Sequence, residues 1–154
     1  MTKFPLSSIV VLNYNGGKDL IHCLNSLRSI NYPKDKYEII VVDNASTDGS
    51  ADIAEERFSE VKIIRNRVNL GFSAGNNIGL KSASGEYLVV LNFDTEVSVN
   101  WLLELVKTAE RDDNVGLCTS KLLMFNERKI LNSAGGGVHY LGFHWPKGFG
   151  KQDG

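Results

Sequence analysis

The stretch that decides the fold is Ile39-Ile40-Val41-Val42-Asp43-Asn44-Ala45-Ser46-Thr47-Asp48-Gly49-Ser50. Four consecutive apolar residues, two of them valine, predict a strand that is covered on both faces, as in a parallel sheet. The polar residues that follow predict a turn and the start of a helix. A strand that passes through a polar loop into a helix is the repeating unit of an α/β protein.

The same alternation continues along the chain on both sides of this stretch. It predicts an α/β fold with a Rossmann-like, mostly parallel sheet and helices on both faces. The mixed run at 61–64 is expected near an edge of the sheet. Helix 50–58 is expected to bury Ile53, Ala54 and Phe58. Glycines at 71, 75 and 79 predict a close approach of the third helix to the sheet or to a ligand. The expected strands are 9–12, 39–42, 61–64, 87–91 and 115–118.

The length of 154 residues corresponds to one domain, and its end differs in composition from the rest. Seven of the 15 glycines fall in the last 20 residues, without a helical or strand period. We therefore expect 138–154 to be a glycine-rich loop or tail. An α/β sheet normally finishes on a strand or a packed helix, so we expect the chain to be the front part of a longer protein.

Charge, cysteine content and missing motifs exclude several classes of function. A net charge of −1 argues against nucleic-acid binding, which needs an excess of Lys and Arg. The two widely separated cysteines, Cys23 and Cys118, fit a reduced, cytoplasmic setting. The longest apolar runs are far shorter than the ~20 residues that span a bilayer. The chain contains no dinucleotide-binding G-x-G-x-x-G after its first strand, no P-loop, no zinc-ligand spacing and no serine nucleophile elbow.

Polar residues follow each of the first four predicted strands. Ligands of open α/β sheets bind beyond the carboxyl ends of the strands, so these segments are the candidate site. Turn formation by Asn, Asp and Gly alone would account for any one of them. Four such segments at one edge favour a binding rim. They are 13–17, 43–50, 65–71 and 92–96.

These segments resemble the successive motifs of glycosyltransferase family 2, the inverting enzymes of the GT-A fold. The resemblance covers about Ile9 to Gly137, and the form Leu91-Asn92-Phe93-Asp94-Thr95 is similar to the rhamnosyltransferase-type branch. It implies transfer of a sugar from a nucleotide-diphosphate sugar to a saccharide or lipid-linked acceptor. Residues 1–137 would then hold the donor. It also implies a cytoplasmic location, with peripheral association at the inner face of the membrane for a longer protein.

The resemblance assigns the individual site residues. The carboxylate of Asp43 accepts from the nucleobase, and Asp94 binds Mg²⁺ or Mn²⁺, which bridges to the diphosphate. Asn92 replaces the first aspartate of the family's D-x-D motif. No position after Gly137 matches the family's catalytic base, which we expect beyond Gly154. The remaining donor-binding residues are Asn13, Asn15, Arg65, Asn69, Gly71 and Asn76.

Two other functions remain open at this point. A sugar-1-phosphate nucleotidyltransferase shares the strand order and the ligand, but the loop 13–18 lacks the arginine that such an enzyme carries there. A nucleotide-sugar-binding module without transfer activity would keep the donor residues and need no base. An assay of sugar transfer separates the second possibility from an enzyme.

Overall fold

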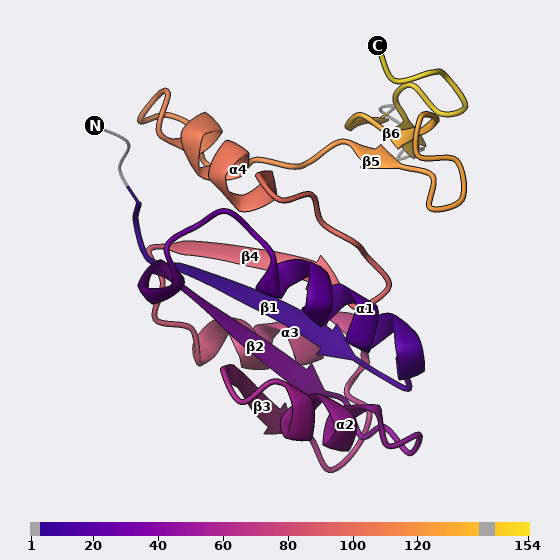
Figure 1. Ribbon diagram of the computed structural model, residues 1–154. Helices are drawn as coiled ribbons and strands as arrows, with labels where there is room; N and C mark the ends of the chain where they lie inside the picture. Colours follow the sequence, from indigo (N-terminus) through magenta and orange to yellow (C-terminus); the bar gives the residue numbers. More distant parts are fainter. Residues whose placement is uncertain (1–3, 139–143) are drawn as a thin grey trace. The chain divides into compact units, whose positions relative to one another are not determined.

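The structure, a computed structural model, describes residues 4–138 and 144–154 and divides the chain into two compact units, Met1–Val106 and Lys107–Gly154. The first unit contains a parallel four-stranded sheet in the order β3-β2-β1-β4 (Figure 1). The expected alternation of strands and helices is confirmed. In chain order the elements are β1 (Ser7–Asn13), α1 (Gly17–Arg28), a short 3-10 helix (Lys34–Lys36), β2 (Tyr37–Asp43), α2 (Ser50–Arg57), β3 (Val61–Arg65), α3 (Gly71–Lys81), β4 (Tyr87–Asn92) and α4 (Trp101–Ala109).

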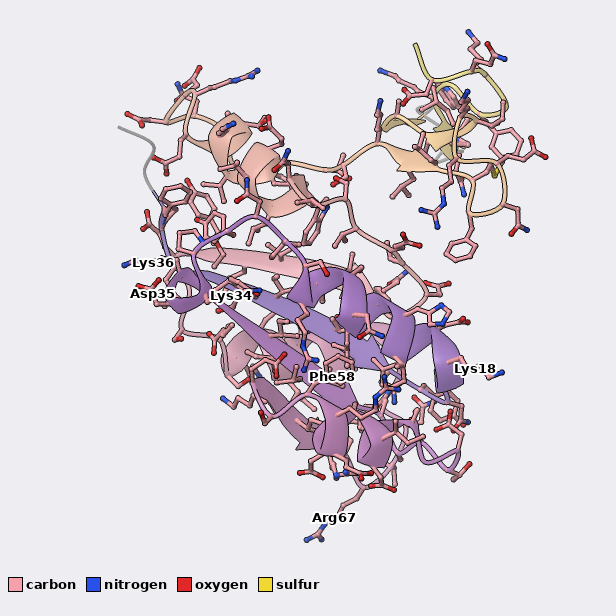
Figure 2. All side chains as sticks on the ribbon, in the orientation of Figure 1. Lys18, Lys34, Asp35, Lys36, Phe58 and Arg67 are labelled. Carbon is pink, nitrogen blue, oxygen red and sulfur yellow. The ribbon has the colours of Figure 1, made fainter. Side chains whose placement is uncertain are left out.

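Helices cover both faces of this sheet, as the sequence predicts. On one face, the core residues of β1 and β2 pack with buried side chains of α1, α2 and α4. On the other face, the remaining apolar side chains of the same strands pack against α3 (Figure 1). Figure 2 shows Phe58 inside the first layer, while Lys18 and Arg67 extend outward. The central strands β1 and β2 therefore contribute apolar residues to both layers.

Two glycines let α3 approach the sheet. A Cβ atom on Gly79 would lie 2.4 Å from Val10 Cγ1, and one on Gly75 would lie 2.4 Å from Leu12 Cδ1. The predicted close approach is thus confirmed at these two positions, and it is made to the sheet. At Gly71 the requirement is different, because its φ of +79° is a conformation that favours glycine.

Three expectations about burial and strands are wrong. No strand forms at 115–118, where Leu117 is 91% exposed, because an apolar run does not by itself supply a partner strand. Ile53 is exposed on α2, which buries Ala54 and the following Phe58 instead. The continuous run at 87–91 predicts a strand covered on both faces, like that at 39–42, but β4 lies at an edge of the sheet and alternates between exposed and covered side chains. The edge position expected for β3 is confirmed.

The second unit is built from short antiparallel strand pairs. The glycine-rich end differs from the expected loop, because β8 pairs with β7. The Trp145 ring packs on Gly137, so closely that a Cβ atom at position 137 would lie 2.4 Å from the ring. Residues 139–143 of the expected loop lie outside the described residues. No helix in the described ranges is long and apolar enough to cross a membrane. The strands are β5 (Leu122–Leu123), β6 (Leu131–Ser133), β7 (Gly136–Val138) and β8 (His144–Pro146).

Candidate functional site

The parallel register brings the polar strand ends to one edge of the sheet. Asn13, the last residue of β1, is aligned with Asp43, the last residue of β2. Asp43 is aligned in turn with Arg65 at the end of β3. On the other side of β1, Leu12 is aligned with Asn92 of β4. Four residues that the sequence places in four separate motifs therefore end adjacent strands.

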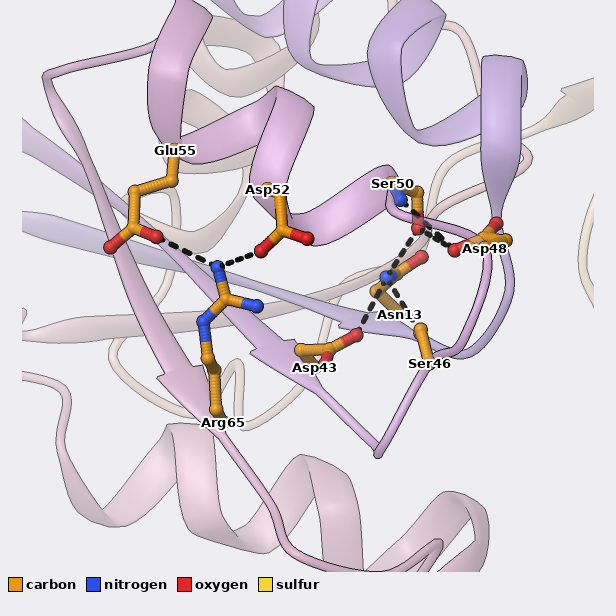
Figure 3. A network of polar contacts seen from close by, with 8 residues as sticks. All are labelled: Asn13, Asp43, Ser46, Asp48, Ser50, Asp52, Glu55 and Arg65. Carbon is orange, nitrogen blue, oxygen red and sulfur yellow. Dashed lines mark hydrogen bonds and ion pairs between the residues drawn. The ribbon is translucent and has the colours of Figure 1, made fainter.

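Asn13 is the centre of a buried hydrogen-bond network at this edge (Figure 3). Its side chain is fully buried, and its Nδ2 atom lies 2.9 Å from Asp43 Oδ1 and 3.0 Å from the hydroxyl oxygens of both Ser46 and Ser50. Its Oδ1 atom accepts from the backbone N–H of Gly16 at 3.1 Å. The loop after β1 and the loop after β2 are thus joined through one amide group.

Asp48 and Asn15 tie the same two loops together on the outside. Asp48 Oδ2 accepts from the backbone N–H of Gly17 at 2.8 Å, and its Oδ1 accepts from the N–H and hydroxyl of Ser50. Burial alone would raise the pKa of Asp48, but these hydrogen bonds outweigh it and lower the pKa. Asn15, with a φ of +53°, accepts from the backbone N–H of Thr47 at 2.8 Å. Asp48 therefore fixes the turn.

Asn44 organises the loop between β3 and α3, a role that the sequence analysis missed. Its buried side chain accepts from the N–H of Leu70 and the amide of Asn66, both at 3.0 Å. It donates to Asn69 Oδ1 at 2.7 Å, and that oxygen also accepts from the N–H of Gly71. Two predicted donor residues, Asn69 and Gly71, are thus placed by Asn44. The available signal was an amide immediately after Asp43 at the end of a buried strand.

The Arg65 guanidinium does not pair with its neighbour Asp43. Arg65 Nη2 lies 2.8 Å from Asp52 Oδ1 and 2.7 Å from Glu55 Oε2, both on α2 (Figure 3). The hydrogen bond with Glu55, together with the two negative charges, raises the pKa of Arg65. All three side chains are exposed, so the pairs contribute little to stability. Among the described residues, Asp43 forms no ion pair with a cationic side chain.

Asn92 and Asp94 lie at the carboxyl end of β4, with both side chains exposed. Burial raises the pKa of the nearby Cys23 thiol to about 12, and the negative charge of Asp94 adds to this shift. Cys23 Sγ lies 3.8 Å from the carbonyl oxygen of Asn92. Between the two site residues, the Phe93 ring would meet a Cβ on Gly16 at 2.9 Å, so the loop after β1 packs on this segment.

The residues at the end of β4 fit a divalent cation only in part. The described residues contain no group of three or more His, Cys, Asp and Glu side chains that could hold a metal ion. Asp94 supplies one exposed carboxylate, and Asn92 supplies one neutral amide oxygen. Mg²⁺ is commonly bound by one or two carboxylates, with water and substrate phosphates as the other ligands. The donor set fits a cation that arrives together with a diphosphate.

Asn76 is buried within α3 and differs from the other predicted donor residues in the hydrogen bonding of its side chain. Its Nδ2 atom donates to the carbonyl oxygen of Phe72 at 3.0 Å. Its Oδ1 atom is the one buried side-chain polar atom without a hydrogen-bond partner in the part of the chain that the structure describes. A carbonyl oxygen accepts hydrogen bonds, so this atom suits a hydroxyl or N–H group and not a phosphate oxygen.

Comparison with known proteins places the chain among glycosyltransferases. The sequence profile of Glycosyl transferase family 2 matches residues 8–151. Glycosyltransferase AglE of Haloferax volcanii is 35% identical over 107 residues, which are 68% of this chain and 35% of that protein. A poly(ribitol-phosphate) beta-glucosyltransferase of Bacillus spizizenii is 33% identical over 130 residues, which are 82% of this chain and 20% of that protein.

Solved structures show the same fold. The mannosyltransferase PcManGT from Pyrobaculum calidifontis, in complex with GDP-Man and Mn²⁺, matches with a TM-score of 0.70 and 28% identity, over 78% of this chain and 37% of that one. This likeness confirms the expected GT-A fold. The chain spans less than half the length of each of these three relatives. The profile match covers nearly all of the described residues, and the chain belongs to glycosyl transferase family 2.

Proposed function

We propose that the chain binds the nucleotide-diphosphate sugar of a glycosyltransferase at the carboxyl edge of its sheet. One observation carries this proposal: the Asp43 carboxylate is held by Asn13 at the end of β2, while the neighbouring Arg65 pairs with other acids. A fixed carboxylate without a cation partner is suited to accept from the N–H of a nucleobase. PcManGT, which binds GDP-Man with Mn²⁺, shares the fold and supports this assignment.

The remaining predicted residues surround the diphosphate and sugar in this proposal. The loop that Asn44 organises presents Asn69 and Gly71, and α3 begins at the latter. Backbone N–H groups at a helix start attract phosphate oxygens. Asp94 would hold Mg²⁺ or Mn²⁺, and the bound cation would supply positive charge against the diphosphate leaving group. Asn15, Asn76 and Asn92 complete the donor site.

The reaction proposed for the whole protein is an inverting sugar transfer. The oxygen of an acceptor hydroxyl attacks the anomeric carbon, the bond from that carbon to the diphosphate breaks, and the electron pair leaves with the nucleoside diphosphate. A general base accepts the hydroxyl proton. We propose a saccharide or lipid-linked acceptor, a role similar to that of the rhamnosyltransferase-type branch, and a place in polysaccharide synthesis at the cytoplasmic face of the membrane.

Nucleotide binding tests the first step of this proposal. A ligand at 100 times its dissociation constant stabilises a fold by about 2.7 kcal/mol. At roughly 2–4 °C per kcal/mol for a chain of this size, the melting temperature should rise by about 5–11 °C. The experiment is thermal unfolding with UDP, GDP or dTDP, each with and without Mn²⁺. Asp43→Asn, which keeps the side-chain shape, is the matched control, and the absence of a shift with all three nucleotides would refute donor binding.

Transfer by the whole protein is tested separately, with sugar donors of the nucleotide that binds. Nuclear magnetic resonance of the product reports the configuration of the new glycosidic bond. An inverting reaction gives the configuration opposite to that of the donor, and retention would refute the mechanism without affecting the binding proposal.

A further inference from the structure

The Asn13 side chain is used entirely inside the protein. Its two N–H hydrogens face three acceptors, Asp43 Oδ1, Ser46 Oγ and Ser50 Oγ, within 3.0 Å, and its carbonyl oxygen accepts from the Gly16 N–H. Its side chain is fully buried. Asn13 therefore has neither the exposed surface nor a free polar group with which to contact a nucleotide.

We propose that Asn13 is a positioning residue that selects the nucleobase through Asp43. Within the described residues, Asp43 accepts a side-chain hydrogen bond from Asn13 at Oδ1, which leaves Oδ2 for the ligand. The terminal torsion of an aspartate is broad, so without this hydrogen bond the torsion alone would not fix the orientation of the carboxylate. This inference rests on the proposed nucleotide site and adds the residue that orients its carboxylate.

The hydrogen bond from Asn13 also keeps Asp43 apart from the neighbouring Arg65. Asp43 and Arg65 are aligned on neighbouring strands, yet the guanidinium pairs with Asp52 and Glu55 of α2. A carboxylate released from Asn13 would gain access to that guanidinium, and a paired carboxylate no longer accepts well from a base. The neutral amide of Asn13 thus holds Asp43 in place without neutralising it.

The substitution Asn13→Asp separates this role from a purely structural one. It places two carboxyl groups within about 3 Å of each other, a distance at which like charges resist simultaneous ionisation and share a proton. Nucleotide affinity of the variant should therefore fall as the pH rises and the second carboxyl ionises. The exposed Asn25 on α1 provides the matched control, because Asn25→Asp makes the same change of charge away from the network.

The experiment measures the dissociation constants of UDP, GDP, CDP and ADP by calorimetry with Mn²⁺, at pH 5.5 and 8.5. For Asn13→Asp, we expect affinity for the nucleotide that wild type prefers to fall about tenfold between the two pH values, relative to wild type and Asn25→Asp. In Asn13→Ser the shorter side chain cannot reach Asp43. The preference of this variant for that nucleotide over the others should therefore drop about tenfold or more, because a hydrogen bond to a charged group contributes that much to affinity.

Each other outcome counts against the proposal. The proposal would be overturned if the folded variants keep the base preference and the pH profile of wild type. It would also be overturned if the variants bind all four nucleotides equally more weakly, because that result indicates a structural role. If Asn13→Asp does not fold, the base preference of Asn13→Ser decides, and failure of both to fold would also assign Asn13 a structural role. Wild type that binds none of the nucleotides would instead refute the proposed function.

Discussion

The substitution Gly79→Ala tests how closely α3 must approach the sheet. The new Cβ would lie 2.4 Å from Val10 Cγ1 and 2.9 Å from Val42 Cγ2, and both valines are fully buried and stiff about their first torsion. Overpacking of this kind costs about 1–3 kcal/mol, while alanine gains about 1 kcal/mol over glycine inside a helix. The net expectation is a loss of roughly 0–2 kcal/mol in the free energy of unfolding.

Gly75→Ala is the matched control on the same helix. Its new Cβ would also meet an atom at 2.4 Å, but that atom is Leu12 Cδ1, the end of a flexible side chain that can move. We therefore expect Gly79→Ala to unfold at a lower temperature than Gly75→Ala, by roughly 2–4 °C for each kcal/mol of difference. The measurement is thermal unfolding followed by circular dichroism. A Gly79→Ala protein as stable as Gly75→Ala, or more stable, would refute the packing argument.

Three further predictions concern the site. Asp94→Asn should remove the Mn²⁺-dependent part of nucleotide affinity in calorimetry, while the melting temperature stays unchanged. Asn92→Ala should lower the Mn²⁺-dependent affinity by a smaller amount. Equal metal dependence in wild type and Asp94→Asn would show that the cation binds at another site. The double substitution Asp52→Asn and Glu55→Gln frees the Arg65 guanidinium to pair with Asp43 and should weaken nucleotide binding, whereas unchanged or stronger binding would show that the pairs of Arg65 do not keep this carboxylate available. The pKa of Asp48 is lowered from 3.8 on folding, so its charged form stabilises the fold above that pH and this contribution is lost as the pH falls through the lower folded value. The stability difference between wild type and Asp48→Asn should accordingly be constant above about pH 5 and shrink as the pH falls below 3.8 in thermal unfolding, and a difference that stays constant down to about pH 2 would contradict the assignment.

The fold of the first unit was largely predictable because its signals are local. Apolar runs such as 39–42 select buried strands, and polar turns after them select helix starts. The run at 115–118 carries the same local signal, yet it forms no strand, because a strand also needs a partner that local sequence does not name. The β7 and β8 pair shows the converse, since Trp145 packing over Gly137 makes strands where composition predicts a loop.

For the site, the sequence by itself determined which residues end the strands, and the resemblance to a known family supplied their proposed roles. Tertiary structure decided which of them are free to act. It buried Asn13 and joined it to Asp43, a residue 30 positions away, and it turned Arg65 toward two acids on α2. It also made Asn44 the organiser of the Asn69 loop. These outcomes depend on strand register and on competition among neighbouring polar groups, which arise only when distant segments are brought side by side.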